Sequence, residues 1–195
     1  DVEMLERLGV GAHKIGSDDA NNIPYLKYVA RKMKPIFLST GMCTMAEVRE
    51  SVDAILEEGN DRLYLMHAIS RYPTQPQHVN LRAMQSMMEE FPKIPIGYSD
   101  HTLGITACLC AAAMGATSLE MHFTYDRAAD GPDHMHSATP DEMAELVQRV
   151  REFETMRGNG LKRPTELEIM SRYNTRKSLV LEADIKAGER ITREN

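Results

Sequence analysis

The chain has 195 residues, of which 42% are hydrophobic and 27% charged, enough for one domain with a substantial core and a short further segment. Its formal net charge of -6 combines both signs without a basic stripe, which argues against a nucleic-acid partner. No apolar run approaches the length of a membrane span and no secretion signal opens the chain, so we expect a soluble protein that does not bind a membrane. The three cysteines, Cys43, Cys108 and Cys110, lack paired spacing, which favours a reducing, cytoplasmic location.

Short β-rich runs alternate with amphipathic helical runs along most of the chain. The expected strands are residues 11–17, 35–40, 62–70, 94–101 and 118–125. The expected helices that follow them are residues 22–33, 44–59, 79–91, 105–115 and 139–158. Two helix starts carry capping signals, namely Thr44 with Glu47 and Thr139 before Pro140. This repeat predicts an α/β fold with a parallel sheet and crossover helices.

The ends of the expected strands distinguish between two such architectures. A doubly wound sheet gathers its ligand at one switch point, whereas a (β/α)8 TIM barrel places polar residues at the C-terminal end of nearly every strand. Here all five ends are polar: Lys14 and Ser17, Ser39 and Thr40, His67 and Ser70, Ser99 to His101, and Glu120 and His122. We therefore predict a TIM barrel. Because a closed barrel needs eight units, we expect the chain to lack the first three β/α units.

The pattern changes after Gly158. Residues 159–176 are polar and interrupted by Pro164, which is typical of a linker. Residues 178–195 read as a strand, a turn at 186–189 and the start of another strand. The predicted domains are thus a barrel part over residues 1–158, a linker over 159–176 and the beginning of a small β-rich domain over 177–195.

The stretch "SLEMHFT" and the residue His101 suggest a metal site. Strand alternation places Glu120, His122 and Thr124 on one face and the apolar residues between them on the other, which we expect to face the helices. His101 ends the preceding strand, so two imidazoles and a carboxylate would meet at the barrel mouth. Such a set suits a catalytic divalent cation such as Mn²⁺ or Mg²⁺. The alternative is a pair of hydrogen-bonded structural histidines.

Further polar residues at the strand ends could bind an anionic substrate. Lys14, Ser39, Ser70 and Ser99 each lie at a strand end, where their donors could converge on a phosphate or carboxylate. Any single serine there could instead cap a turn or helix.

The sequence leaves two roles undetermined, that of one polar loop and that of Asp100. The loop with Asp133, His134 and His136 beside Gly131-Pro132 could present polar groups to substrate hydroxyls or could be solvated. Asp100 could orient His101 or cap the turn.

The ordered motifs "KIGS", "KPIFLSTGM", "YPTQPQHVNL", "GYSDHTLG", "LEMHFT" and "GPDH" resemble those of the sialic acid synthases, which condense phosphoenolpyruvate with N-acetylmannosamine or a related amino sugar. The resemblance covers nearly the whole chain. Residues 177–195 look like the beginning of the antifreeze-like (SAF) domain that follows the barrel in that family. The resemblance also implies a homodimer, in which the antifreeze-like domain of one subunit caps the partner's barrel and contributes an arginine to the sugar site.

The resemblance implies a role for each matching residue. His101 and His122 match the histidines that hold the divalent metal, Mn²⁺ or Mg²⁺, and Glu120 matches the acidic catalytic residue beside phosphoenolpyruvate. Positions that bind phosphoenolpyruvate match Lys14, Ser39, Ser70 and Ser99, and positions that contact the amino sugar match Tyr72 and Asp133. In the implied reaction the metal polarises the sugar aldehyde and the methylene carbon of phosphoenolpyruvate attacks it. Water then adds, and phosphate leaves with cleavage of the C–O bond.

The chain departs from the family pattern at Asp18 and Asp19, where members often have Gly-Glu after the serine, and this change affects the sugar assignment. The predicted function is therefore a metal-dependent synthase of a sialic-type nonulosonic acid. The alternatives are a pseudaminic or legionaminic acid synthase, another sugar-acid synthase that uses phosphoenolpyruvate, or an inactive fragment or non-catalytic sugar-binding domain.

Overall fold

A computed structural model describes residues 2–193, and their central feature is a parallel sheet. Its strands are β1 (His13–Ile15), β2 (Ile36–Ser39), β3 (Leu63–Ala68), β4 (Ile96–Asp100) and β5 (Leu119–Met121). They lie in the order β1-β2-β3-β4-β5, so each strand pairs with its neighbour in the sequence. A doubly wound sheet would reverse this order at a switch point. The unreversed order is that of a half-barrel, and the closure by three further units stays a prediction.

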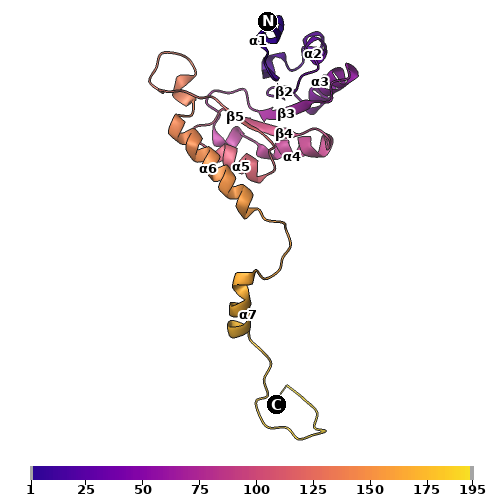
Figure 1. Ribbon diagram of the computed structural model, residues 1–195, viewed down its shortest axis with the longest axis vertical. Coiled ribbons are helices and arrows are strands. Elements are labelled where there is room, and N and C mark those ends of the chain that lie inside the picture. Colours follow the sequence, from indigo (N-terminus) through magenta and orange to yellow (C-terminus); the bar gives the residue numbers. More distant parts are fainter. Residues whose placement is uncertain (1, 194–195) are drawn as a thin grey trace. The chain divides into compact units, whose positions relative to one another are not determined.

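The helices that follow the strands form at the positions expected from the sequence: α2 (Ile23–Ala30), α3 (Met45–Glu57), α4 (Leu81–Glu90), α5 (Thr106–Ala113) and α6 (Pro140–Met156). A further helix, α1 (Val2–Leu8), precedes β1. Figure 1 shows α2 to α6 following one another along an arc outside the strands. The predicted capping box at Thr44 forms, because Thr44 N donates to Glu47 Oε2 over 2.7 Å and Glu47 N donates to Thr44 Oγ1 over 3.4 Å.

The two faces of the sheet differ in character. The helix-facing side chains form the core and are at most 2% exposed: Ile15, Ile36, Leu38, Leu63, Leu65, Ile96 and Tyr98. Leu119 and Met121 pack against this core, as strand alternation predicts, but Phe123 lies beyond the strand and is 59% exposed. The opposite face carries the stacked rings of Phe37 and Tyr64, whose centroids are 4.6 Å apart. The predicted polar residues lie on this face at the C-terminal ends of the strands.

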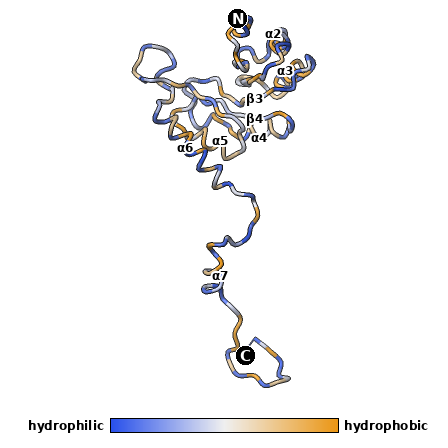
Figure 2. Tube along the Cα trace, viewed as in Figure 1, coloured by the Kyte–Doolittle hydropathy of each residue, from blue (hydrophilic) through white to orange (hydrophobic). Residues whose placement is uncertain are grey.

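The described residues after Met156 form a second unit, which begins at Arg157. The predicted linker contains a short helix, α7 (Ile169–Thr175). The strand predicted from Ser178 is wrong, because residues 178–193 form turns and irregular backbone. Figure 2 shows an apolar stretch after α7, where Leu179 is 104% and Val180 85% exposed. A lone pair of strands is marginal without an apolar partner surface, which explains the missing strand.

The turn predicted at residues 186–189 does form, with Glu189 N donating to the carbonyl of Lys186 over 3.0 Å. The antifreeze-like assignment stays a prediction, and residues 194–195 lie outside the described part of the chain. Within the described residues, no helix is both long and apolar enough to span a membrane.

Candidate functional site

The C-terminal ends of the five strands surround a cavity of about 380 Å³. The parallel register brings Ala68, Ser99 and Glu120 side by side on β3, β4 and β5. The cavity is lined by Lys14, Gly16, Ser17, Asp18, Ser39, Met42, Ser70, Tyr72, Ser99, His101, Glu120 and His122. Eight of the nine residues singled out in the sequence therefore share one cavity. The ninth, Asp133, lies beside it, with Oδ2 at 3.6 Å from Nδ1 of His122.

A hydrogen-bonded group joins four of these side chains across the cavity floor. Lys14 Nζ donates to Ser39 Oγ over 2.8 Å and lies 3.3 Å from Glu120 Oε1. Ser99 Oγ donates to the same oxygen, Glu120 Oε1, over 2.8 Å. The Lys14 ammonium thus links the Ser39 hydroxyl to the Glu120 carboxylate, to which Ser99 also donates, and the arrangement combines anion-binding donors with a proton acceptor.

His101 and His122 stand at the rim of the cavity, with ring centroids 5.4 Å apart. His101 Nδ1 lies 2.7 Å from the carbonyl oxygen of Ile69, and this contact requires the proton on Nδ1 and leaves the lone pair on Nε2. Burial lowers the pKa of His101, which keeps the ring neutral. The Tyr72 ring packs on His101 at 4.1 Å and against His122 at 5.5 Å. A neutral, oriented imidazole is what a divalent metal requires, so this donor set fits such an ion.

Asp133 begins a short 3-10 turn, His134–His136, that approaches the rim from the loop after β5. The sequence left open whether this loop is solvated. His136 is in fact only 5% exposed, and its ring lies 5.0 Å from that of His122. His134 instead binds inside the loop, where its Nδ1 lies 2.7 Å from Thr124 Oγ1. His136 is therefore buried at the rim, whereas Gly131 to Asp133 and Met135 in the same loop are exposed.

Asp100, whose role the sequence left undetermined, caps a turn. Its Oδ1 accepts from Thr102 N over 2.8 Å and from the hydroxyl of Tyr98 over 3.0 Å. Its Oδ2 lies 3.1 Å from Thr102 Oγ1 and 3.4 Å from Cys108 Sγ. These contacts fix the chain on either side of His101 and resolve the choice in favour of the turn cap.

Comparison with known proteins identifies the family. The model of the NeuB family matches residues 1–162. The chain belongs to the NeuB family. It is 44% identical, over its whole length and 55% of the relative, to the N,N'-diacetyllegionaminic acid synthase of Legionella pneumophila. It is 39% identical, over 98% of this chain and 53% of the relative, to the N-acetylneuraminate-9-phosphate synthase of Homo sapiens.

A solved structure agrees with the family assignment. The N-acetylneuraminic acid synthetase of Leptospira borgpetersenii, in complex with citrate, superposes with a TM-score of 0.81 at 34% identity. The match covers 91% of this chain and 62% of that one. The sequence-based assignment to the sialic acid synthases is thereby confirmed at the level of the family. The chain spans about half the length of the curated NeuB relatives it matches.

The structure places further residues in the site of this NeuB chain, to which the sequence analysis assigned no ligand: Ser17, Asp18 and Gly41. Ser17 Oγ accepts from Gly41 N over 2.9 Å, which ties the loop after β1 to the loop after β2. A Cβ on Gly41 would meet Ser70 Oγ at 2.3 Å and Ser17 Oγ at 2.7 Å, so a side chain at this position would displace both hydroxyls. Asp18 also lines the cavity. The glycine in "STGM" was the available signal for a close approach.

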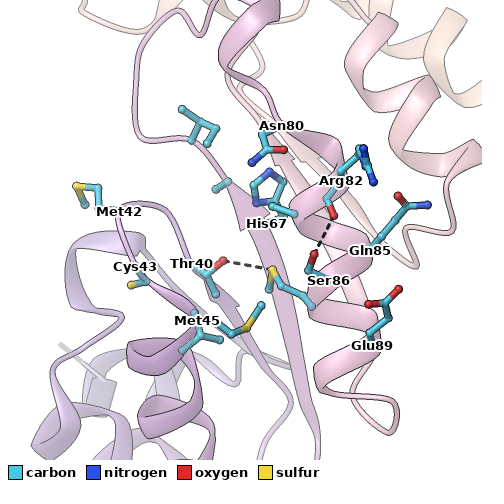
Figure 3. Close-up of a pocket in the computed structure, with 15 residues that line it drawn as sticks. Thr40, Met42, Cys43, Met45, His67, Asn80, Arg82, Gln85, Ser86 and Glu89 are labelled. Carbon is cyan, nitrogen blue, oxygen red and sulfur yellow. Dashed lines mark hydrogen bonds between the residues drawn. The ribbon is translucent and has the colours of Figure 1, made fainter.

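A larger cavity, of about 680 Å³, lies between the start of α3 and the length of α4, beside the end of β3 (Figure 3). Its buried polar groups are bonded within the protein: His67 Nε2 lies 2.9 Å from the carbonyl of Val79, and Thr40 Oγ1 donates to the carbonyl of Met66 over 3.0 Å. Because these groups do not converge on a common point, we assign the functional site to the strand-end cavity.

Proposed function

We propose that the protein condenses phosphoenolpyruvate with an N-acetylated amino sugar to give a nonulosonic acid and phosphate. The observation that carries this proposal is the convergence of Lys14, Ser39, Ser99 and Glu120 with two imidazoles in one cavity. A bifunctional anion needs cationic and hydroxyl donors, and the carbon–carbon bond formation needs a polarised carbonyl beside a proton acceptor. Membership of the NeuB family supports the same reaction class.

We assign each residue a role according to its position in the cavity. Lys14 and the Ser39 and Ser99 hydroxyls face the anionic groups of phosphoenolpyruvate, with Ser70 beside them on the same cavity wall. Glu120 receives its two donors at Oε1, so Oε2 can accept a proton from the water that adds. Tyr72 and Asp133, at the rim, face the amino sugar. A divalent metal held by His101 and His122 supplies, when bound, Lewis-acid activation of the sugar aldehyde.

Two classes of amino sugar are candidate substrates for this site. The Legionella relative supports a 2,4-diacetamido sugar of the legionaminic type, and the human relative supports an N-acetylmannosamine derivative. Asp18 lines the cavity and adds a carboxylate that an amide N–H or a sugar hydroxyl can contact. The higher identity to the first relative makes the diacetamido sugar our preferred substrate.

The test is phosphate release by the full-length protein from phosphoenolpyruvate, with each of the two sugars and with or without Mn²⁺. We expect release that depends on both the sugar and the metal. Glu120→Gln should lower kcat by at least a hundredfold, while the matched variant at an exposed position, Glu89→Gln, should leave it unchanged. Absence of phosphate release with every amino sugar would refute the proposed reaction.

His122→Ala tests the metal assignment separately. We expect this variant to lose Mn²⁺ binding while its far-ultraviolet circular dichroism stays that of the unaltered protein, because the side chain is only partly buried. An unchanged Mn²⁺ affinity would contradict the assignment of His122 as a ligand.

A further inference from the structure

The His136 imidazole has a buried nitrogen without a hydrogen-bond partner. Its Nε2 is the one buried side-chain nitrogen or oxygen of the described residues that lacks such a partner. The side chain is 3% exposed and lies against the rings of His122 and Tyr72, at centroid distances of 5.0 and 5.5 Å. An unsatisfied buried nitrogen costs about 1–3 kcal/mol. Such a group in a native structure calls for a missing partner, for example an ion.

The carboxylate of Asp133 lies between two imidazoles. Asp133 Oδ2 is 3.6 Å from His122 Nδ1, and Asp133 Oδ1 is 3.8 Å from His136 Nε2. Both distances exceed the range of a hydrogen bond. One ligand atom from each of the three side chains lies within 4.8 Å of the other two.

These separations match ligands of a common ion. With bonds of about 2.1 Å, two ligands of one metal lie about 3.0 Å apart at a right angle and about 4.2 Å apart when opposite. The separation of His122 Nδ1 from Asp133 Oδ2 and that of His136 Nε2 from Asp133 Oδ1 both fall between these limits. The ligand atoms of all three side chains lie within 4.8 Å of one another, slightly beyond the upper limit. Two imidazoles and one carboxylate leave open positions for water or substrate.

The chemistry of the imidazole agrees with a ligand role. Nε2 of His136 can present its lone pair to an ion when the ring proton resides on Nδ1.

We propose that His136 is an additional metal ligand, which together with His122 and Asp133 binds a divalent first-row cation at the rim of the site. This inference rests on the proposed function in requiring a metal at His122. It gives Asp133 a role as ligand beside the sugar contact suggested by the family resemblance. The ion then joins the end of β5 to the turn at residues 133–136, so metal binding also fixes this loop.

The test compares Mn²⁺ binding by the full-length protein and its His136→Leu variant, measured by electron paramagnetic resonance. We expect the Kd for Mn²⁺ to rise at least tenfold and the pulsed spectrum to lose one nitrogen coupling. His78→Ala, at an exposed histidine, serves as the matched control and should change neither. In the absence of metal, His136→Leu should be at least as stable as the unaltered protein, because it removes the unsatisfied nitrogen.

A second measurement covers the case in which the leucine variant fails to fold. His136→Gln keeps the size and polarity of the side chain and should show the same loss of a nitrogen coupling. Hydrogen exchange of residues 126–139 should slow on addition of Mn²⁺ in the unaltered protein and not in either variant. A Kd within twofold of the unaltered value and an unchanged number of couplings would overturn the inference. If His122→Ala then still abolishes binding, the proposed metal site stands without His136. Phosphate release reports on the reaction independently.

Discussion

Replacement of Asp100 by alanine removes a buried carboxylate that organises the turn around His101. Asp100 is 2% exposed. Its two oxygens receive Tyr98 OH at 3.0 Å, Thr102 N at 2.8 Å, Thr102 Oγ1 at 3.1 Å and Cys108 Sγ at 3.4 Å. The variant leaves these groups facing a small cavity without an acceptor.

The cost follows from which of these donors can find another partner. The Thr102 amide is fixed in the backbone and the Tyr98 hydroxyl belongs to a residue that is 1% exposed, so both stay unsatisfied at about 1–3 kcal/mol each. The Thr102 hydroxyl and the Cys108 thiol can rotate and add little. We therefore expect Asp100→Ala to lower the free energy of unfolding by roughly 2–6 kcal/mol.

Asp100→Asn should be much milder, at about 1–2 kcal/mol. Its amide oxygen can accept from Tyr98 and from the Thr102 amide, while its NH₂ group donates to the Thr102 hydroxyl and the Cys108 sulfur after these rotate. The difference between the two variants therefore isolates the value of an acceptor at Oδ1.

The assay is urea unfolding of the full-length protein, followed by circular dichroism, for Asp100→Ala, Asp100→Asn, Tyr98→Phe and the Asp100→Ala, Tyr98→Phe double variant. The double variant should be less destabilised than the sum of its singles, because Tyr98 has no hydroxyl left to satisfy. A loss below about 1 kcal/mol for Asp100→Ala, or an asparagine variant less stable than the alanine variant, would refute the reasoning.

Three further predictions concern single side chains. Burial holds the pKa of His67 below its ordinary value of 6.5, so below that pH the unfolded chain binds a proton that the folded chain does not. The free energy of unfolding should then decrease as the pH is lowered below 6.5, by up to about 1.4 kcal/mol per pH unit. Urea unfolding between pH 5 and 7 should show a smaller slope for His67→Gln, and equal slopes for the two proteins would contradict the prediction. Lys14→Met should raise the KM for phosphoenolpyruvate at least tenfold in the phosphate-release assay, because Ser39 and its neighbours then meet the anion without a cation; an unchanged KM would exclude the contact. Thr44→Ala should cost about 1 kcal/mol in thermal unfolding through loss of the helix cap, and no loss would show that the cap is not formed in solution.

The sequence predicted the strand–helix order because each element carries its own periodicity and end signals. The five strands predicted before Gly158 and the five helices that follow them form at the expected positions. The strand predicted over residues 118–125 ends at Met121 in the structure. Thr124 lies in the following loop, where its Oγ1 accepts a hydrogen bond from Asp126 N over 3.1 Å. The strand predicted from Ser178 failed because alternation alone cannot supply the apolar surface that a strand must cover.

The site could be predicted where topology alone decides the position of a residue. Parallel strands bring their ends to one edge, so Lys14, Ser39, Ser99 and Glu120 had to meet. The burial of His136 could not be predicted, because a loop of this length has no periodicity and its path depends on contacts with the strand ends. The approach of Gly41 to Ser70 likewise depends on the separation of two loops that are distant in the sequence.

Strand alternation explains how "GYSDHTLG" serves two purposes within consecutive residues. Ser99 pairs in register with Glu120 and faces the cavity, so Asp100 must point to the opposite, helix-covered side. A carboxylate placed there can only be retained if donors surround it, and Tyr98, Thr102 and Cys108 provide them. The chain is thereby anchored on both sides of His101, and the ring can be held at the rim without a direct contact to Asp100. The stability of the Asp100 cluster and the position of the His101 imidazole are therefore coupled through the backbone.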